Sequence, residues 1–338
     1  MVEVGLALVA VFLATLVLTA WMRYIALRRG YLDHPNARSS HSEPTPRGGG
    51  LAIAISASVA IAGFYYWHYV DAPLAAALIG GGLFIAAIGL RDDRHSLSTG
   101  IRLLAHLAAA AWAVYILGGV PSIRVGGLIV SLGIWGDMAG IIAIVWVLNL
   151  FNFMDGIDGI AASEAAFVTG IGGVLAIAFE QNYAVGFSAF AITAATLAFL
   201  WWNWSPAKIF MGDVGSGYLG YSIAVIGLAA GRASPIALLV WIILGGVFFT
   251  DATITLLLRF VRGERIYLAH RDHAYQHLAA RWGSHCRVTL LVCAVNLLAL
   301  FPVAWLACVH QELAATLAAV TLLFLSVIVL MLRKVRNS

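Results

Sequence analysis

The stretch Ala72–Arg94, APLAAALIGGGLFIAAIGLRDDR, runs for nineteen residues without a charge and then ends in two arginines around two aspartates. A helix needs roughly 20 mostly apolar residues to cross the hydrocarbon of a bilayer, so this run predicts a spanning helix with carboxylates at the membrane surface. The whole chain has the same character, because 62% of its 338 residues are hydrophobic and only 11% are charged. A soluble domain carries about 25% charged residues. The sequence therefore predicts an integral membrane protein.

Ten further stretches share this apolar character. Together they predict an all-α, polytopic membrane protein with about eleven transmembrane helices in a single domain over residues 1–338. Residues 121–137 leave room for a partial span. The expected spans are Val4–Met22, Gly49–Tyr66, Ala72–Leu90, Ile101–Gly118, Met138–Asn152, Gly159–Phe179, Ala184–Trp202, Gly215–Ala230, Pro235–Leu258, Val288–Val309 and Leu313–Leu332.

The distribution of basic residues predicts the orientation. With the N-terminus outside, eighteen of the twenty Lys and Arg residues fall on the cytoplasmic side, and only Arg124 and Arg232 fall outside. Such a bias is the positive-inside pattern of membrane proteins. We therefore expect an outer N-terminus and a cytoplasmic C-terminus. The net charge of +4 is too small to suggest a nucleic-acid partner.

Three aspartates lie at predicted membrane boundaries on the cytoplasmic side. Asp92 and Asp93 follow the apolar run quoted above, and Asp213 lies in the glycine-containing segment 210–216, FMGDVGS. Glycines let backbone N–H groups approach an anion, and the helix expected after Asp213 could aim its N-terminus at one. This segment is a candidate anion site.

A second polar motif repeats at intervals of three residues after a long apolar run. On a helix this spacing puts neighbouring members near one face, although glycines at 156 and 159 suggest that the helix opens into a loop. The members of this motif are Asn149, Asn152, Asp155 and Asp158.

These loops bring five carboxylates to one side of the membrane. A carboxylate near an apolar span is costly unless it is hydrated, paired or bound to a cation. Hard oxygen donors favour Mg²⁺, or alternatively Mn²⁺, which commonly bridges carboxylates to substrate phosphates. Each aspartate alone is more simply a solvated loop residue or a helix cap. Jointly they predict a divalent-cation site.

A histidine cluster occupies the last long cytoplasmic loop. His270, His273 and His277, spaced i, i+3 and i+7, would share one helical face. That face could bind zinc through His273 and His277, but the arginines around it, Arg265, Arg271 and Arg281, favour phosphate. A solvated basic face is an equal alternative on spacing alone.

Two polar residues fall inside predicted spans. An intramembrane carboxylate such as Asp251 is a functional candidate by default, and it could equally be a structural partner for Arg259, two turns further on. His106 follows Arg102 by one turn, and polar packing is its ordinary explanation.

The long motifs give the chain a specific resemblance. NLFNFMDGIDG at 149–159 and PAKIFMGDVGS at 206–216, preceded by PRGG at 46–49 and by the Asp92–Asp93 pair, resemble the polyprenyl-phosphate N-acetylhexosamine-1-phosphate transferases, glycosyltransferase family 4. The resemblance covers nearly the whole chain. The spread histidines of HAYQH at 273–277 are more similar to the members that initiate O-antigen synthesis than to the peptidoglycan enzyme.

The resemblance implies a role for each motif. Asp213 would be the Mg²⁺ ligand, Phe210 would stack on uracil, and Asp92 and Asp93 would be the catalytic pair. The four members of the 149–158 motif would bind the nucleotide and diphosphate. The basic and histidine-loop residues expected at the substrate are Arg47, Arg102, His270, Arg271, His273 and His277.

The resemblance also implies a reaction. A UDP-N-acetyl sugar would give its sugar-1-phosphate to undecaprenyl phosphate, releasing UMP, at the bacterial cytoplasmic membrane, in an enzyme that is commonly a homodimer. UDP-GlcNAc and UDP-activated deoxy-amino sugars are both candidate donors, and donor choice is expected in the loop 259–287. The rival interpretation is a transporter or flippase, since many spans with glycine-broken helices also suit alternating access.

Overall fold

The structure is a computed structural model that describes residues 2–35, 43–121, 123–125, 128–264 and 270–334. Two short antiparallel strand pairs, β1 (Leu32–Asp33) with β2 (Thr45–Pro46) and β3 (Ile123–Val125) with β4 (Leu128–Val130), accompany a helical bundle. The α-helices of the described ranges are α1 (Val2–Arg29), α2 (Gly50–Tyr66), α3 (Ala72–Ala76), α4 (Gly82–Arg94), α5 (Thr99–Ile116), α6 (Gly133–Met154), α7 (Ile160–Glu180), α8 (Tyr183–Asn203), α9 (Asp213–Ala233), α10 (Pro235–Leu244), α11 (Gly246–Val261), α12 (Ala274–Trp282), α13 (His285–Val295), α14 (Phe301–Val309) and α15 (Ala314–Lys334).

The eleven predicted spans are all helical. Nine segments within the described ranges are long and apolar enough to cross a membrane, and α2, with 17 residues, is shorter. Three of the nine are composite. A π-helical turn, η1 (Ala77–Gly81), joins α3 to α4, another, η2 (Asn296–Leu300), joins α13 to α14, and a 3-10 turn, η3 (Gln311–Leu313), leads into α15. The prediction of an all-α, polytopic membrane protein is confirmed.

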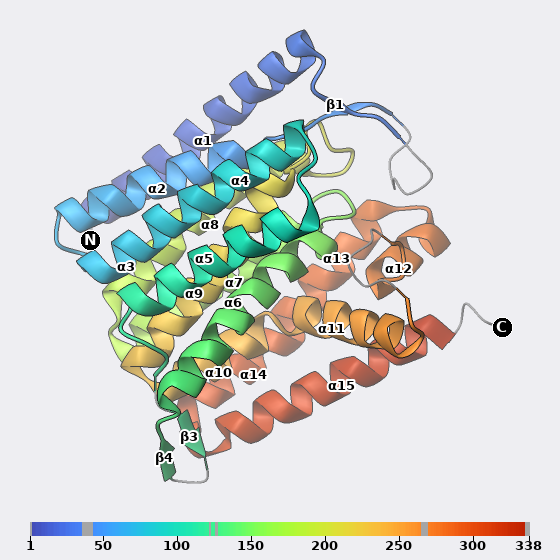
Figure 1. Ribbon diagram of the computed structural model, residues 1–338. Coiled ribbons are helices and arrows are strands. Elements are labelled where there is room, and N and C mark those ends of the chain that lie inside the picture. The colour runs from blue at the N-terminus through green and yellow to red at the C-terminus, as the bar shows by residue number, and fades with distance from the viewer. Residues whose placement is uncertain (1, 36–42, 122, 126–127, 265–269, 335–338) are drawn as a thin grey trace.

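The core of the bundle lies along α9. About 89% of the most apolar window of this helix is buried, against 22% for α1 and for α15. The helices α2, α4, α6 and α8 pack around α9, and α1 and α15 lie at opposite margins of the bundle (Figure 1). The buried α9 carries Asp213 at its first residue, so the centre of the fold positions one of the predicted site residues.

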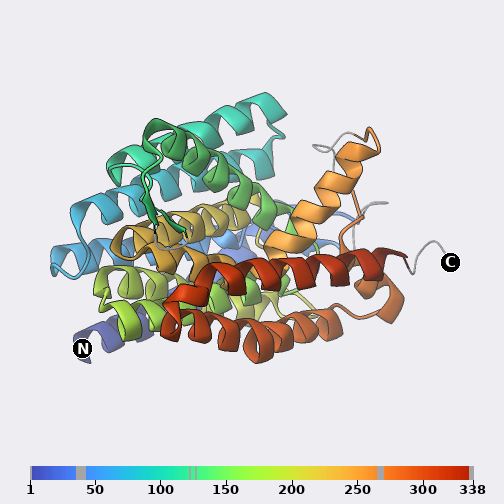
Figure 2. The same cartoon turned by 90° about the horizontal axis from the view of Figure 1, so that it is seen from below.

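The ninth predicted span is not one continuous helix, which corrects the sequence interpretation. It breaks at Gly245 into α10 and α11, whose axes differ by 74°, and α11 leaves the bundle at a steep angle in Figure 2. A glycine pair, Gly245–Gly246, lies at the break, and glycines are a common cause of sharp kinks. A Cβ at Gly245 would lie 2.6 Å from the ring of Phe249, so the absent side chain makes room for the bend.

The segment 121–137 holds no separate partial span in its described residues, although the sequence allowed one. It forms the β3–β4 hairpin and then enters α6, which begins at Gly133, five residues before the predicted start. The resulting 22-residue helix is long enough to cross a membrane.

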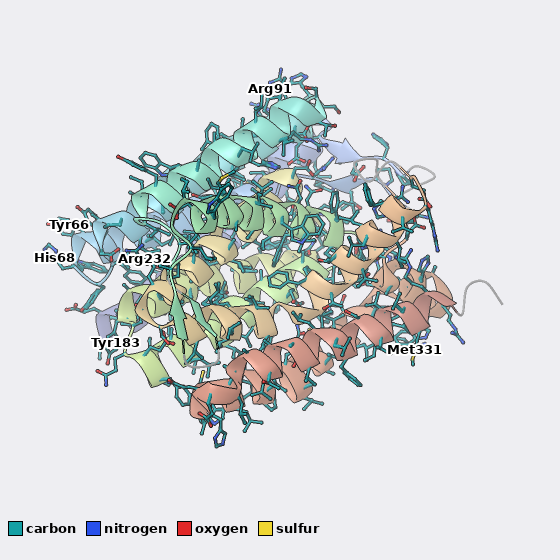
Figure 3. The ribbon with its side chains drawn as sticks, turned by 60° about the horizontal axis from the view of Figure 1, so that its bottom comes forward. Tyr66, His68, Arg91, Tyr183, Arg232 and Met331 are labelled. Atoms are coloured by element: carbon teal, nitrogen blue, oxygen red, sulfur yellow. The ribbon has the colours of Figure 1, made fainter. Side chains whose placement is uncertain are left out.

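The two ends of the bundle differ in which residues they carry. Figure 3 shows Tyr66, His68, Tyr183 and Arg232 toward one end and Arg91 toward the other. The Arg91 end carries the C-terminal end of α4 and the first residue of α9, and there the predicted site residues gather. Which end faces the cytoplasm stays a prediction from the basic residues.

Candidate active site

Asp93 is a cap for the central helix. Asp93 lies near the C-terminal end of α4. Its Oδ1 accepts the backbone N–H of Asp213 at 2.9 Å, and its Oδ2 accepts the backbone N–H of Val214 at 3.2 Å. The first N–H groups of a helix have no partner within the helix, and their positive end attracts an anion. The anion that the sequence led us to expect at the N-terminus of α9 is therefore a side chain of this protein.

This cap depends on close contact between α4 and α9. A Cβ at Gly89 would lie 2.5 Å from the carbonyl oxygen of Asp213 and from the amide nitrogen of Val214. Gly212, with φ of 75°, has a backbone conformation that L side chains rarely adopt, and a Cβ there would strike the Asp93 carboxylate. Glycine at both positions lets the carboxylate reach the helix end.

Arg47 joins the two carboxylates at this helix end. Its Nε lies 2.9 Å from Oδ1 of Asp93, and one terminal nitrogen lies 2.9 Å from Oδ1 of Asp213. Burial lowers the pKa of the Arg47 guanidinium, but the charges of Asp93 and Asp213 outweigh it, so the pKa is raised. The arginine stays charged.

The backbone holds Arg47 in place. The segment Pro46–Gly50 hydrogen-bonds along residues 210–211: the Phe210 N–H donates to the Pro46 carbonyl at 2.8 Å, and the Gly49 N–H donates to the Phe210 carbonyl at 3.0 Å. The PRGG and FMGD motifs, far apart in the sequence, thus lie side by side and are joined by backbone hydrogen bonds.

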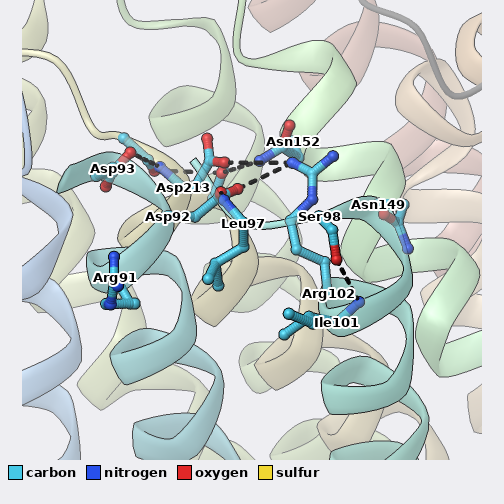
Figure 4. Close-up of polar contacts among 12 residues, drawn as sticks. Arg91, Asp92, Asp93, Leu97, Ser98, Ile101, Arg102, Asn149, Asn152 and Asp213 are labelled. Carbon is cyan, nitrogen blue, oxygen red and sulfur yellow. Dashed lines mark hydrogen bonds and ion pairs between the residues drawn. The ribbon is translucent and has the colours of Figure 1, made fainter. Parts of the chain in front are cut away.

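Asp92 has different partners from its neighbour. Its Oδ2 lies 2.9 Å from a terminal nitrogen of Arg102, on α5, and its Oδ1 accepts the Leu97 N–H at 2.6 Å. The same Arg102 nitrogen lies 3.8 Å from Oδ2 of Asp213. Figure 4 shows Asp92, Asp93 and Asp213 converging, with Arg102 extending toward them. The side chain of Asp213 is 22% exposed, against 8% for Asp92 and 5% for Asp93, so it is the most open of the three.

Asp213, together with Asp155 and Asp158, lines a cavity of about 260 Å³. Asn152 ends the helical part of its motif and donates from Nδ2 to the Ser216 hydroxyl at 3.3 Å, while α6 ends at Met154 and leaves Asp155 and Asp158 in the following turn. The expected opening of the helix into a loop is confirmed. The predicted site residues that line this cavity are Arg47, Asn152, Asp155, Asp158, Phe210 and Asp213.

Asp155 and Asp158 differ in their electrostatic surroundings. Burial raises the pKa of Asp155 to about 7; Arg47 opposes the rise, and the charges of Asp213 and Asp93 add to it. Burial also acts on Asp158, but His285, whose Nδ1 lies 3.3 Å from Oδ2, together with hydrogen bonds from Ser205 and the Ala207 N–H, outweighs it and holds the pKa of Asp158 below its usual value. The effect of burial is therefore less fully offset by neighbouring groups at Asp155 than at Asp158.

Two further cavities adjoin the carboxylates. A space of about 80 Å³ is lined by Asp92, Arg102 and Asn149, and also by His106, whose Nδ1 lies 3.4 Å from the Asn149 amide nitrogen. A larger groove of about 550 Å³ lies beside α1 and α4 and shares Arg47 with the first cavity. Its lining combines apolar side chains with three arginines and two aspartates, so basic groups are in excess beside an apolar surface, an arrangement that suits a molecule with an apolar chain and an anionic head.

The histidine loop differs from its predicted form. α12 begins at Ala274, so His270 and His273 precede the helix and do not share one helical face with His277. The rings of His270 and His273 stack 4.9 Å apart, both nearly buried, and both lie against Phe153. The lining of the main cavity includes none of the four predicted residues of this loop among those that the structure describes: His270, Arg271, His273 and His277.

Neither the zinc site nor the solvated basic face gains support in the histidine loop. The described residues contain no group of three His, Cys, Asp or Glu side chains that could hold a metal, so a zinc site at His273 and His277 lacks further ligands there. His270 and His273 are too buried for a solvated face. Arg265 lies outside the described residues.

Asp251 and Arg259 do not pair with each other, which corrects one of the two readings of Asp251. Arg259 binds Glu264 at 2.8 Å and also binds Asp272. The Asp251 carboxylate instead accepts backbone N–H groups from α12.

Sequence reasoning missed several residues of the cavity. Gln276 and His285 line it, although the histidine spacing directed attention to other members of the same loop. Asn203 ties two loops together, because its Oδ1 accepts the Gly159 N–H at 3.1 Å and its Nδ2 donates to the Ile209 carbonyl at 2.9 Å. Asn203 lies three residues before the PAKIFMGDVGS motif at 206–216, and that position was the only available signal.

Comparison with known proteins agrees with the family resemblance of these motifs. Residues 75–231 match the family described as glycosyl transferase family 4. A probable undecaprenyl-phosphate N-acetylglucosaminyl 1-phosphate transferase of Bacillus subtilis is 31% identical over 299 residues, which cover 86% of this chain and 81% of the relative. The chain belongs to glycosyl transferase family 4. The resemblance stated from the motifs is confirmed.

Two further relatives show the breadth of this glycosyl transferase family. The decaprenyl-phosphate N-acetylglucosaminephosphotransferase of Mycolicibacterium smegmatis is 30% identical, covering 86% of this chain and 79% of the relative. The phospho-N-acetylmuramoyl-pentapeptide-transferase of Lactiplantibacillus plantarum is 29% identical, covering 75% of this chain and 82% of the relative. The family likeness therefore extends beyond the motifs to most of the transmembrane chain.

Proposed function

We propose that this protein transfers an N-acetylhexosamine-1-phosphate from a UDP-activated sugar to undecaprenyl phosphate. An oxygen of the lipid phosphate attacks the β-phosphorus of the donor, the bond between that phosphorus and the bridging oxygen breaks, and UMP leaves with the bridging oxygen. The products are UMP and a lipid-linked diphosphate sugar. The names of the three relatives support this reaction class.

The observation that carries the proposal is the convergence of charges at one end of a membrane bundle. A nucleotide diphosphate and a lipid phosphate repel each other, so their approach needs positioned cations. Arg47 and Arg102 supply two such charges within 4 Å of Asp213. The adjoining cavity carries Phe210, which has the flat ring suited to stacking on uracil, and Asn152 supplies an amide for hydrogen bonds.

The acidic residues of this site fit a divalent cation. Mg²⁺ is usually held by one or two carboxylates together with waters and substrate phosphates, so it does not require a cage of three side chains. Four carboxyl groups, those of Asp92, Asp93, Asp155 and Asp213, lie near only two guanidinium groups, those of Arg47 and Arg102, and a bound cation would favour the ionised form of Asp155, whose pKa is raised to about 7. We propose that Asp213, the most open of the three converging aspartates, holds Mg²⁺, or alternatively Mn²⁺, with Asp155 lining the same cavity. The ion would neutralise charge on the diphosphate.

Asp92 and Asp93 organise the site in this proposal. Both oxygens of Asp93 accept N–H groups of α9, and both oxygens of Asp92 are engaged by Leu97 and Arg102. The lipid phosphate is already largely ionised near neutral pH, since the second pKa of a phosphate ester is about 6. The reaction then needs no general base from this pair.

The sugar and the biological setting are further parts of the proposal. Because Gln276 and His285 are the described residues of the loop 259–287 that line the main cavity, we infer that they contribute to donor choice. Exchange of this loop with that of a relative using another donor should change selectivity, and unchanged selectivity would refute the inference. Synthesis of O-antigen or a related envelope polysaccharide, a place in the bacterial cytoplasmic membrane, and a homodimer remain predictions.

The test is UMP release by the purified protein in detergent with undecaprenyl phosphate, Mg²⁺ and a panel of UDP-N-acetyl sugars. We expect lipid-dependent UMP release that EDTA abolishes and that Asp213→Asn lowers by roughly a hundredfold or more, the scale of a lost electrostatic group. Asp137→Asn, the same change at the other end of the bundle, is the matched control, and it should retain activity. Failure to release UMP with any donor would refute the proposed function.

A further inference from the structure

Asp251 is a buried carboxylate that the proposed chemistry does not use. It lies on α11 and is 3% exposed. Its Oδ1 accepts the Ala274 N–H at 2.9 Å, and its Oδ2 accepts the Tyr275 N–H at 3.1 Å. The Thr255 hydroxyl, one turn along the same helix, donates to Oδ1 at 3.1 Å. Both carboxylate oxygens therefore face the beginning of α12.

This contact supplies charged acceptors at the start of α12. The first N–H groups of a helix need acceptors, which a Ser, Thr, Asp or Asn at the N-cap usually provides. The N-cap of α12 is His273, whose backbone N–H donates to Oε1 of Gln276 at 3.3 Å and whose Nδ1 lies 3.6 Å from Oδ1 of Asp251. A helix of nine residues is too short to be stable by itself. Its position must come from tertiary contacts, of which the Asp251 carboxylate is the charged one at the helix start.

The helix connects Asp251 to the wall of the main cavity. The Tyr275 hydroxyl donates to the Phe153 carbonyl at 3.0 Å, in the last turn of α6. A Cβ at Gly156 would overlap the Tyr275 hydroxyl and would lie 3.0 Å from the Gln276 amide nitrogen, so α12 packs directly on the turn after α6. Gln276, Gly156 and Asp155 all line the cavity.

We propose that Asp251 is a positioning residue that sets α12 against the 152–158 turn and so fixes the donor-binding wall of the cavity. The inference rests on the proposed function for its kinetic consequence. Asp251 does not touch the cavity lining itself and acts through the backbone of Ala274 and Tyr275. Its removal should therefore weaken donor binding more than it slows the chemical step.

Two measurements on Asp251→Asn test this. The substitution keeps the shape and removes the charge. Hydrogen exchange of the full-length protein should show faster exchange, by about tenfold or more, at the amides of the α12 start, as expected when a local hydrogen bond is lost. The KM for the UDP-sugar should rise by roughly tenfold, the scale of a hydrogen bond to a charged group, while the KM for the lipid and kcat change by less than about threefold.

Asp71→Asn is the matched control. Asp71 is the N-cap of α3, and its Oδ1 accepts the Leu74 N–H at 2.9 Å, so the same charge is removed from another helix start. It lies at the other end of the bundle from the carboxylates. This variant should leave the exchange of α12 and the donor KM unchanged.

Tyr275→Phe provides a second route to the same wall. It removes the hydroxyl bond to Phe153 and leaves the Asp251 contacts intact, so it should raise the donor KM by a smaller factor. If both residues act through α12, the double variant should show less than the product of the two single effects. Multiplicative effects on KM, or equal losses of donor and lipid affinity, would overturn the proposal.

The exchange measurement separates this proposal from the proposed reaction. Unchanged exchange at the α12 start in Asp251→Asn would refute the positioning role even if the enzyme were active. Absence of UMP release by the unaltered protein would instead refute the function, and the exchange result would still report on the position of α12.

Discussion

At the scale of single residues, adjacent aspartates have separate tasks. The sequence presents Asp92 and Asp93 as one pair, but consecutive side chains on a helix point about 100° apart. Asp93 faces α9 and receives its N–H groups, whereas Asp92 faces α5 and binds Arg102. Two aspartates that are adjacent in a sequence therefore need not share one role.

The capping role of Asp93 and the more open position of Asp213 predict distinct effects of substitutions at these two residues. Asp93→Asn should lower the free energy of unfolding by roughly 1.5–3 kcal/mol, because it weakens charged hydrogen bonds to α9 and to Arg47. Asp213→Asn should cost less stability, since its carboxylate is more exposed, and should abolish the stabilisation by Mg²⁺ together with UMP. Thermal unfolding in detergent measures both. An Asp93→Asn variant as stable as the unaltered protein would contradict the capping role.

The raised pKa of Asp155 predicts a pH-dependent stability. Between the ordinary value of 3.8 and about 7, the folded protein retains a proton that the unfolded chain has released, so stability falls as pH rises through this range and is level above it. The total loss is on the order of a few kcal/mol, since one pKa unit corresponds to about 1.36 kcal/mol. In EDTA, the unfolding temperature should drop between about pH 4 and about pH 7, and Asp155→Asn should reduce that drop. Parallel curves for the two proteins would contradict it.

At the scale of elements, apolar length predicted the helices well, and local pattern predicted their breaks poorly. Every expected span is helical because twenty apolar residues in a bilayer have no other way to satisfy their backbone. The break at Gly245 lies beside Phe249, four residues further along the chain, where two glycines allow the kink. The start of α12 depends on a tertiary neighbour, Asp251. The spacing of three histidines gives no information about Asp251.

The contact between α4 and α9 predicts the effect of one added methyl group. Gly89→Ala would place a Cβ 2.5 Å from backbone atoms of Asp213 and Val214. The helices must separate, which costs about 1–3 kcal/mol as overpacking does, and the Asp93 cap lengthens with them. We expect a lower unfolding temperature and UMP release reduced by roughly tenfold.

Gly100→Ala is the control for this change. An added Cβ at Gly100, on α5, meets no atom within 4 Å, so the same substitution should leave activity unchanged. Its stability should rise slightly, because alanine favours a helix over glycine. Equal losses in the two variants would show that the α4–α9 contact is not the cause.

At the scale of the whole molecule, the site combines residues from both halves of the chain. Motifs at 46–49, 92–93, 149–158 and 206–216 converge at one end of the bundle, and their convergence was expected because all four lie in loops of one predicted side. Gln276 and His285 also line the cavity, and no local pattern identified them. The sequence assigned sides of the membrane, and packing decided which side chains meet.

The orientation is itself testable. Eighteen of twenty basic residues fall on the predicted cytoplasmic side, which is the site-bearing side. A fluorescent protein fused after residue 338 should therefore fluoresce, and alkaline phosphatase at the same position should be inactive. A fusion after residue 68, in the loop between α2 and α3, should give the reverse. The opposite pattern would place the carboxylates outside the cell.

The short second helix bears on the thickness of the surrounding bilayer. The 17 residues of α2 rise about 26 Å, less than the roughly 30 Å of a typical hydrocarbon layer. A bilayer becomes locally thinner around a short hydrophobic helix. Arg47 lies just before the start of α2. A lipid phosphate would then meet Arg47 without withdrawing its chain into water, a move that costs about 0.8 kcal/mol for each methylene. Bilayers of longer acyl chains would oppose this thinning, so membrane thickness becomes a determinant of how readily the acceptor is used.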